Sequence, residues 1–149
     1  MARLLLLNGP NLGLLGTREP ALYGTTTLAA VEASLRKRAV AAGHELDAFQ
    51  SDGEAELIRR VHAARDDRTS LILFNPAAFT HTSIALRDAL LAVRVPFIEV
   101  HLSNVAARED FRQRSFFADI AVGTIAGFGV ASYELALEAA IHYLAREGK

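Results

Sequence analysis

The chain has 149 residues, 51% of them hydrophobic and 22% charged, which is enough apolar surface for one compact catalytic domain over residues 1–149. The formal net charge of −1 gives no overall positive field for a phosphate backbone, so nucleic acid is not an expected partner. The absence of cysteine excludes disulfides, thiolate zinc sites and cysteine nucleophiles. No apolar run approaches the roughly 18–20 residues of a membrane span, and we expect a cytoplasmic protein without membrane association.

Predicted strands and helices alternate along the chain. The continuous apolar run from Arg3 to Leu7 predicts a buried parallel strand, and Thr27 can cap a following helix that Gly43 would end. In chain order, the predicted elements are a strand over 3–7, a helix over 28–42, a strand over 44–49, a helix over 54–64, a strand over 70–74, a helix over 83–91, a strand over 96–100, a short charged helix near 108–114, a strand over 120–125 and a helix over 132–146. This alternation predicts an α/β fold, a flavodoxin-like doubly wound sandwich with a five-stranded parallel sheet.

Polar residues gather where three of the predicted strands end. In open parallel sheets, ligands bind outside the carboxyl ends of the strands, so these residues are expected to line one crevice. They are Asn8 and Asn11 after the first strand, Asn75, Thr80 and His81 after the third, and Glu99, His101, Ser103 and Asn104 at the fourth. Asn75–Pro76 could instead be only a turn, and residues 80–83 could be only a helix cap.

Glu99 lies within an apolar strand, where an unpaired carboxylate would be costly to bury. Because side chains alternate along a strand, Glu99 and His101 are expected on the same face and within reach of each other. A histidine that a carboxylate orients and charges can act as a general acid. A purely structural ion pair is the alternative that this pattern leaves open.

Two further segments carry arginines that could serve a site. Arg108 and Arg112 would share a helix face, which alone is typical of a solvated charge stripe, but their place after the fourth strand favours binding of a substrate hydroxyl or carboxylate. The segment 9–24 is long for a loop in a compact domain, as lids and binding loops often are. Within it, Arg18 could favour the phenolate form of Tyr23 and make it a base, although a tyrosine that only packs is commoner.

Several multi-residue motifs, in this order, resemble those of type II 3-dehydroquinate dehydratase over essentially the whole chain. The matching segments are Asn8-Gly-Pro-Asn-Leu12, Leu15-Gly-Thr-Arg-Glu-Pro20, Tyr23-Gly24, Asn75-Pro76, Phe79-Thr-His-Thr-Ser83, Arg87-Asp88, Ile98-Glu-Val-His-Leu-Ser-Asn104, Arg108-Glu-Asp-Phe-Arg112, Ser115-Phe116 and residues 123–129. Two positions depart from the commonest pattern of that family: Gly13, where asparagine is frequent, and Ala77, where glycine is frequent.

The resemblance implies loss of water from 3-dehydroquinate to give 3-dehydroshikimate, by anti elimination through an enolate. This reaction serves the shikimate pathway of aromatic amino acid biosynthesis or quinate breakdown. The resemblance further implies that Tyr23 removes the C2 proton, that Arg18 favours its phenolate form, and that Asn11 holds a water that stabilises the enolate oxygen. His101, oriented by Glu99, would then protonate the departing C1 hydroxyl.

The same resemblance implies substrate contacts and an assembly. The implied contacts are the backbone N–H groups of Leu102 and Ser103 to the carboxylate, Asn75, His81 and Arg112 to ring hydroxyls, and Arg108 as a second arginine near the tyrosine. The family forms homododecamers built as four trimers. Asp88 resembles the residue that reaches the site of a neighbouring subunit.

No cofactor and no metal are expected, because elimination next to a ketone can run on acid–base groups alone. The two lysines, Lys37 and Lys149, lie in an Arg-rich stretch and at the terminus, so a Schiff-base route has no suitable lysine. A flavodoxin-like fold also hosts FMN carriers and phospho-receiver domains. At the strand exits where a receiver domain needs acidic residues and a lysine, this chain has Asn8, Asn75 and Gly127. An inactive scaffold protein is the remaining alternative.

Overall fold

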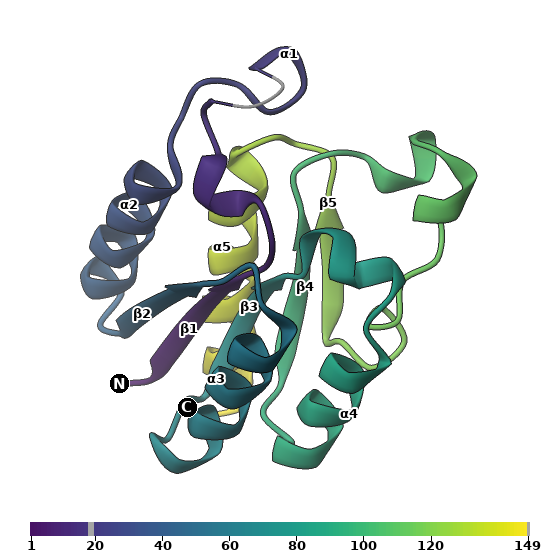
Figure 1. The fold of residues 1–149 in the computed structure, drawn as a ribbon. Helices are drawn as coiled ribbons and strands as arrows, with labels where there is room; N and C mark the ends of the chain where they lie inside the picture. The colour runs from purple at the N-terminus through teal and green to yellow at the C-terminus, as the bar shows by residue number, and fades with distance from the viewer. Residues whose placement is uncertain (18–19, 149) are drawn as a thin grey trace.

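The computed structural model describes residues 1–17 and 20–148, apart from the side chains of Leu22 and Tyr23. Within these residues, five parallel strands form one sheet in the order β2-β1-β3-β4-β5 (Figure 1). The strands are β1 (Arg3–Asn8), β2 (Glu45–Gln50), β3 (Leu71–Asn75), β4 (Phe97–His101) and β5 (Gly123–Ala126). The helices are α1 (Pro20–Tyr23), α2 (Leu28–Ala41), α3 (Glu54–Asp66), α4 (Ile84–Val93) and α5 (Ala131–Arg146), and the 3-10 turns are η1 (Leu12–Leu14), η2 (Ala77–His81), η3 (Val105–Ala107) and η4 (Asp110–Arg112). The predicted flavodoxin-like α/β fold is confirmed.

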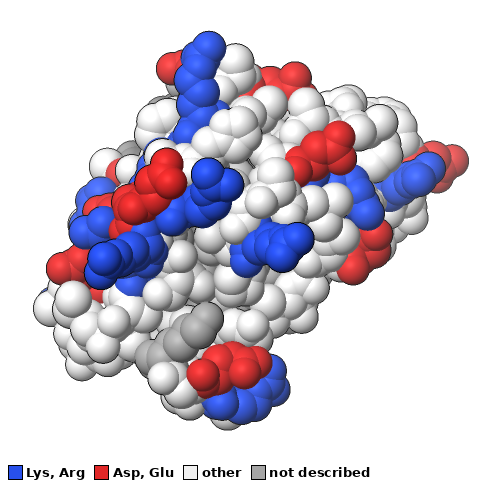
Figure 2. Space-filling model, turned by 90° about the horizontal axis from the view of Figure 1, so that it is seen from below, with Lys and Arg blue, Asp and Glu red and all other residues white. Residues whose placement is uncertain are grey.

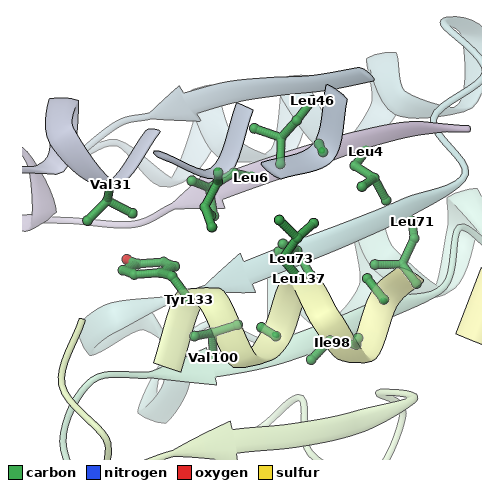
Figure 3. Close-up of a cluster of buried hydrophobic side chains, with 14 of the residues drawn as sticks. Leu4, Leu6, Val31, Leu46, Leu71, Leu73, Ile98, Val100, Tyr133 and Leu137 are labelled. Atoms are coloured by element: carbon green, nitrogen blue, oxygen red, sulfur yellow. The ribbon is translucent and has the colours of Figure 1, made fainter. Parts of the chain in front are cut away.

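Helices cover both faces of the sheet, α2 and α5 on one face and α3 and α4 on the other (Figure 1). Strand alternation divides the fully buried leucines of β1 between two cores: Leu4 and Leu6 pack beside α2 and α5, and Leu5 and Leu7 beside α3 and α4. Burial of each such side chain contributes about 1.5–3 kcal/mol relative to exposure. A continuous apolar run therefore forms a central strand here. Figure 3 shows the first core, with Tyr133 at one end of the cluster.

The predicted helix boundaries have the expected capping chemistry. The Oγ1 of Thr27 accepts a hydrogen bond from the backbone N–H of Ala30 at 3.2 Å at the start of α2. The Oγ of Ser83 accepts one from Leu86 at 3.0 Å and starts α4 directly after η2. Gly43 follows α2 with a φ of 85°, a left-handed conformation that glycine adopts without strain.

The charged helix predicted near residues 108–114 is absent. Within this segment only Asp110–Arg112 form a 3-10 turn, η4; the preceding turn η3 ends at Ala107, and the backbone at Arg108 between the two turns is extended, with φ −95° and ψ −164°. The side-chain amide of Gln113 donates hydrogen bonds to the carbonyl oxygens of Ala106 and Arg108 at 2.8 and 3.2 Å. Because a side chain satisfies these carbonyls, the loop needs no helical turn to do so.

The fifth strand is shorter than predicted, because β5 begins at Gly123 and not at Ile120. Ile120 and Ala121 pack against the core beside α3 and α4, and their backbone N–H groups bond to the carbonyl of Phe117. Their apolar side chains thus serve the core from a turn and not from a strand.

No helix in the described part of the chain is long and apolar enough to cross a membrane. On the face shown in Figure 2, basic and acidic side chains lie interspersed and not in one large patch of a single sign. The fold therefore offers no extended surface of one charge on this face.

Candidate active site

A cavity of about 170 Å³ opens at the carboxyl ends of β1, β3 and β4. The strand order reverses between β1 and β3, and such a reversal leaves a crevice between the connections that leave in opposite directions. The cavity lining includes eight of the predicted site residues, namely Asn11, Asn75, His81, His101, Leu102, Ser103, Arg108 and Arg112. The structure thus brings the three strand exits together, as expected.

Glu99 and His101 form a buried pair on β4. Glu99 is 0% exposed and His101 is 5% exposed, and the Nε2 of His101 lies 2.5 Å from the Oε2 of Glu99. The same oxygen accepts a hydrogen bond from the Ser115 hydroxyl at 2.7 Å. Because an ionised carboxylate can only accept, Nε2 carries a hydrogen and Nδ1 is the ring nitrogen left for a ligand in the cavity.

Asn75 belongs to a second buried polar group, together with Asn8 and Tyr133. The Tyr133 hydroxyl donates to the Oδ1 of Asn8 at 2.6 Å and accepts from the Nδ2 of Asn75 at 3.0 Å. The Oδ1 of Asn75 accepts the backbone N–H of Ala77 at 3.1 Å, which fixes the orientation of the amide. One hydrogen on the Nδ2 of Asn75 remains for a ligand. Burial raises the pKa of the Tyr133 phenol well above its usual range, so this group stays uncharged.

Residues 13 and 77, where the sequence departs from the commonest family pattern, both have a structural consequence. Ala77 lines the cavity with a φ of 53°, in the left-handed region that favours glycine. A Cβ added at Gly13 would lie 3.1 Å from the Oε1 of Gln50, so an asparagine here would require that side chain to shift.

His81 enters the cavity from η2, and its tautomer follows from its partner. Its Nδ1 lies 2.8 Å from the carbonyl oxygen of Arg114. A carbonyl can only accept, so Nδ1 carries the hydrogen, and Nε2 of the neutral ring can accept a hydrogen bond from a ligand hydroxyl.

Arg108 lines the cavity from the extended backbone between η3 and η4, Arg112 lines it from η4, and both lie near the carboxylate of Glu109. The Nε of Arg112 donates to the Oε1 of Glu109 at 2.8 Å, and the Nε of Arg108 lies 3.7 Å from the same oxygen. The backbone N–H of Glu109 and the guanidinium of Arg112 lower the pKa of this carboxyl. A guanidinium has five N–H donors, so Arg112, which is bonded to Glu109 through Nε, has others that can reach an anionic ligand.

Four predicted site residues remain, and of these Asn11 lines the cavity. Asn11 follows β1 with a φ of 69°, and its backbone N–H bonds to the Oδ1 of Asp52 at 2.9 Å. Arg18 and the side chain of Tyr23 lie outside the described residues. Asp88 is exposed on α4 and is not part of the cavity lining of its own chain.

Sequence reasoning did not assign a role to Tyr133 or to Ser115. A tyrosine on the apolar face of a helix resembles any core aromatic, although its hydroxyl needs a partner when buried. For Ser115, no sequence feature indicated a role beyond its place in a motif that matches the family. Across residues 1–17 and 20–148, no group of three or more histidine, aspartate or glutamate side chains is placed to hold a metal ion.

Comparisons with known proteins agree on one family. Residues 2–141 match the model of the family described as Dehydroquinase class II. A 3-dehydroquinate dehydratase of Stutzerimonas stutzeri is 63% identical over 97% of this chain and 99% of its own, and 3-dehydroquinate dehydratase 1 of Pseudomonas aeruginosa is 62% identical over 98% and 99%. The type II dehydroquinase structure of Propionibacterium acnes is similar with a TM-score of 0.90 and 46% identity, covering 95% of this chain and 97% of that one. The chain therefore belongs to the class II dehydroquinase family.

Proposed function

We propose that residues 1–149 form one catalytic domain, a type II 3-dehydroquinate dehydratase that removes water from 3-dehydroquinate to give 3-dehydroshikimate in the shikimate pathway. The observation that carries this proposal is the buried pair of Glu99 and His101 at the wall of a small cavity. A departing hydroxyl needs a general acid, and a histidine held by a carboxylate supplies one. The relatives named 3-dehydroquinate dehydratase, at 62–63% identity over nearly their whole length, support the choice of substrate.

In this mechanism, His101 donates a proton to the departing C1 hydroxyl. Its Nε2 is engaged with Glu99, so Nδ1 delivers the proton. An imidazolium ring carries a hydrogen on both nitrogens, and the carboxylate holds the orientation of the ring during transfer. The 2.5 Å separation of the two side chains supports this division of roles.

The substrate is bound by groups around the same cavity. The backbone N–H groups of Leu102 and Ser103, directly after His101, bind the ring carboxylate. Asn75 donates through Nδ2 to a ring hydroxyl and His81 accepts through Nε2, which is the pattern that their other hydrogen bonds leave. Arg112, Asn75 and His81 together hold the ring hydroxyls, and all five residues line the cavity.

The C2 proton leaves from the face of the ring opposite the departing C1 hydroxyl, as an anti elimination requires. Tyr23 removes the C2 proton, and the guanidinium groups of Arg18 and Arg108 favour its phenolate form. Asn11 holds a water that stabilises the enolate oxygen. The presence of Asn11 and Arg108 in the cavity lining supports these roles.

The enzyme is further proposed to be a cytoplasmic homododecamer of four trimers in which Asp88 reaches a neighbouring subunit's site. Asp88 is exposed and lies outside its own cavity, which supports a role toward another chain. Exposed Phe111, Val122 and Phe128 provide apolar surface that subunit contacts would cover. Light scattering that finds a stable, fully active monomer would contradict this assembly.

The function is tested by adding 3-dehydroquinate to protein treated with a chelator and following the ultraviolet absorbance of the conjugated enone product. Glu99→Gln should slow turnover by about 10²-fold or more, since it weakens general acid catalysis. Glu56→Gln is a matched control, because Glu56 also accepts a serine hydroxyl, at 2.8 Å from Ser51, but does not line the cavity. The proposal fails if wild-type protein gives no product or if the two variants behave alike.

A further inference from the structure

We propose that Ser115 is a positioning residue for the general acid: its hydroxyl holds the Glu99 carboxylate so that Oε2 faces the Nε2 of His101. The inference rests on the proposed function of the pair of Glu99 and His101. Ser115 lies 16 residues beyond Glu99 and is not part of the cavity lining. Its effect on the reaction must therefore pass through Glu99.

The direction of the Ser115 hydrogen bond is fixed by its other partners. The Oγ of Ser115 accepts the backbone N–H groups of Phe117 at 3.0 Å and Ala118 at 3.2 Å. A serine hydroxyl has one hydrogen, and the acceptor that remains for it is the Oε2 of Glu99, at 2.7 Å. The Ser115 hydroxyl therefore donates its one hydrogen to the Glu99 carboxylate.

The orientation of the Glu99 carboxylate depends on this donor, because only one of its two oxygens receives hydrogen bonds from the part of the chain that the structure describes. Oε2 of Glu99 receives hydrogen bonds from both Ser115 and His101. Oε1 is buried and has no hydrogen-bond partner within the described residues. Rotation about the terminal torsion of a glutamate meets only a broad, shallow barrier. Without Ser115, the bond to His101 alone would have to orient both side chains.

Ser115 itself is held by a fixed segment. The backbone N–H of the next residue, Phe116, donates to the carbonyl oxygen of Thr80 at 2.9 Å. Phe117 is fully buried, and its ring centroid lies 5.2 Å from that of Phe74 in a T-shaped contact. The hydroxyl is therefore in place before substrate binds.

This arrangement separates the two proton transfers. Loss of the C2 proton to the base precedes protonation of the departing hydroxyl by His101. A change at Ser115 should slow the second step and leave the first largely intact. Exchange of the C2 hydrogen with solvent should then increase relative to dehydration, which a general loss of active structure would not cause.

The test compares Ser115→Ala with Ser51→Ala. Ser51 is a matched control because it also donates to a glutamate, Glu56 at 2.8 Å, and accepts a backbone N–H, from Gly53 at 3.0 Å, but does not line the cavity. Dehydration and C2 hydrogen exchange are measured together in deuterated water. We expect Ser115→Ala to lower kcat about tenfold with little change in KM, and to raise the ratio of exchange to dehydration by a similar factor. Ser51→Ala should change neither.

Two conservative variants sharpen the result. Ser115→Thr retains the hydroxyl donor and should recover most of kcat, whereas Ser115→Cys retains only a weak donor and should give an intermediate ratio. Equal slowing of exchange and dehydration, or an unchanged ratio in both Ser115→Ala and Ser115→Cys, would overturn the proposal.

A nuclear magnetic resonance measurement keeps this inference separate from the proposed function. In Ser115→Ala, the signal of the hydrogen on the Nε2 of His101 should move downfield, because the carboxylate charge is no longer shared with a hydroxyl. The same signal should be unmoved in Ser51→Ala. Wild-type protein without turnover would contradict the proposed function alone, and an unmoved signal in Ser115→Ala would contradict the positioning role alone.

Discussion

Two buried polar groups border the same cavity from opposite faces of the sheet, and they differ in charge. The charged cluster, Glu99 with His101 and Ser115, faces α3 and α4, whereas the neutral cluster, Asn8 with Asn75 and Tyr133, faces α2 and α5. A carboxylate–imidazole pair can hold and transfer a proton, but amides and a buried phenol can only donate and accept fixed hydrogen bonds. Under the proposed function, the charged cluster on one face of the sheet would supply the acid and the neutral cluster on the other would position the substrate.

Removal of the imidazole should have the largest effect and affect only chemistry. His101→Ala is expected to lower kcat by about 10²–10⁴-fold, which is the usual contribution of a general acid. Exchange of the C2 hydrogen should remain detectable, because enolate formation does not need this proton. Steady-state kinetics with proton exchange followed by nuclear magnetic resonance measures both. Loss of exchange in a folded variant would mean that His101 also serves the first step.

Removal of the phenol hydroxyl should affect binding and stability more than chemistry. Tyr133→Phe leaves Asn8 and Asn75 without their shared partner. It should raise KM several-fold, leave kcat within a few-fold, and lower the free energy of unfolding by about 1–3 kcal/mol. Tyr143→Phe on the same helix is the control, since Tyr143 contacts Arg146 and does not line the cavity. A fall in kcat comparable to that of His101→Ala would remove the distinction between the clusters.

The contribution of the neutral cluster to the free energy of unfolding should also decrease at high pH. Burial raises the pKa of Tyr133 in the folded state above the value of 10.0 expected when unfolded. The unfolded state therefore loses this proton first, so the stabilising contribution is present below about pH 10 and declines as the pH rises further. Denaturant unfolding between about pH 8 and pH 11 should show a steeper loss of stability for wild type than for Tyr133→Phe. Parallel curves would argue against a neutral buried phenol.

The smallest expected effect is at the backbone that supports the neutral cluster. Ala77 bonds to the Oδ1 of Asn75 from a left-handed conformation with a φ of 53°. Ala77→Gly should relieve this strain but increase the freedom of the unfolded chain, for a net gain of about 0.5 kcal/mol in the free energy of unfolding. Calorimetry measures this gain. A loss of stability would show that the surrounding structure does not strain this residue.

The fold and the contact between Glu99 and His101 could be predicted from the sequence, because both follow from the local periodicity of apolar and polar residues. Alternation along β4 predicts that Glu99 and His101 share a face, and the structure has them in contact. The 3-10 turns around Arg108 were not predictable, since they depend on where the side chain of Gln113 finds its carbonyl partners. The contact of Ser115 with Glu99 depends likewise on the path of a loop, which no local pattern encodes.

Stereospecifically deuterated 3-dehydroquinate most directly tests elimination by acid–base side chains without a covalent intermediate. With deuterium at the C2 position anti to the departing hydroxyl, chelator-treated protein should release 3-dehydroshikimate that has lost the label. Sodium borohydride added during turnover should leave the protein mass unchanged, because neither Lys37 nor Lys149 is expected to bind the ketone. Product that retains the anti deuterium, or protein that gains the mass of reduced substrate, would contradict the mechanism.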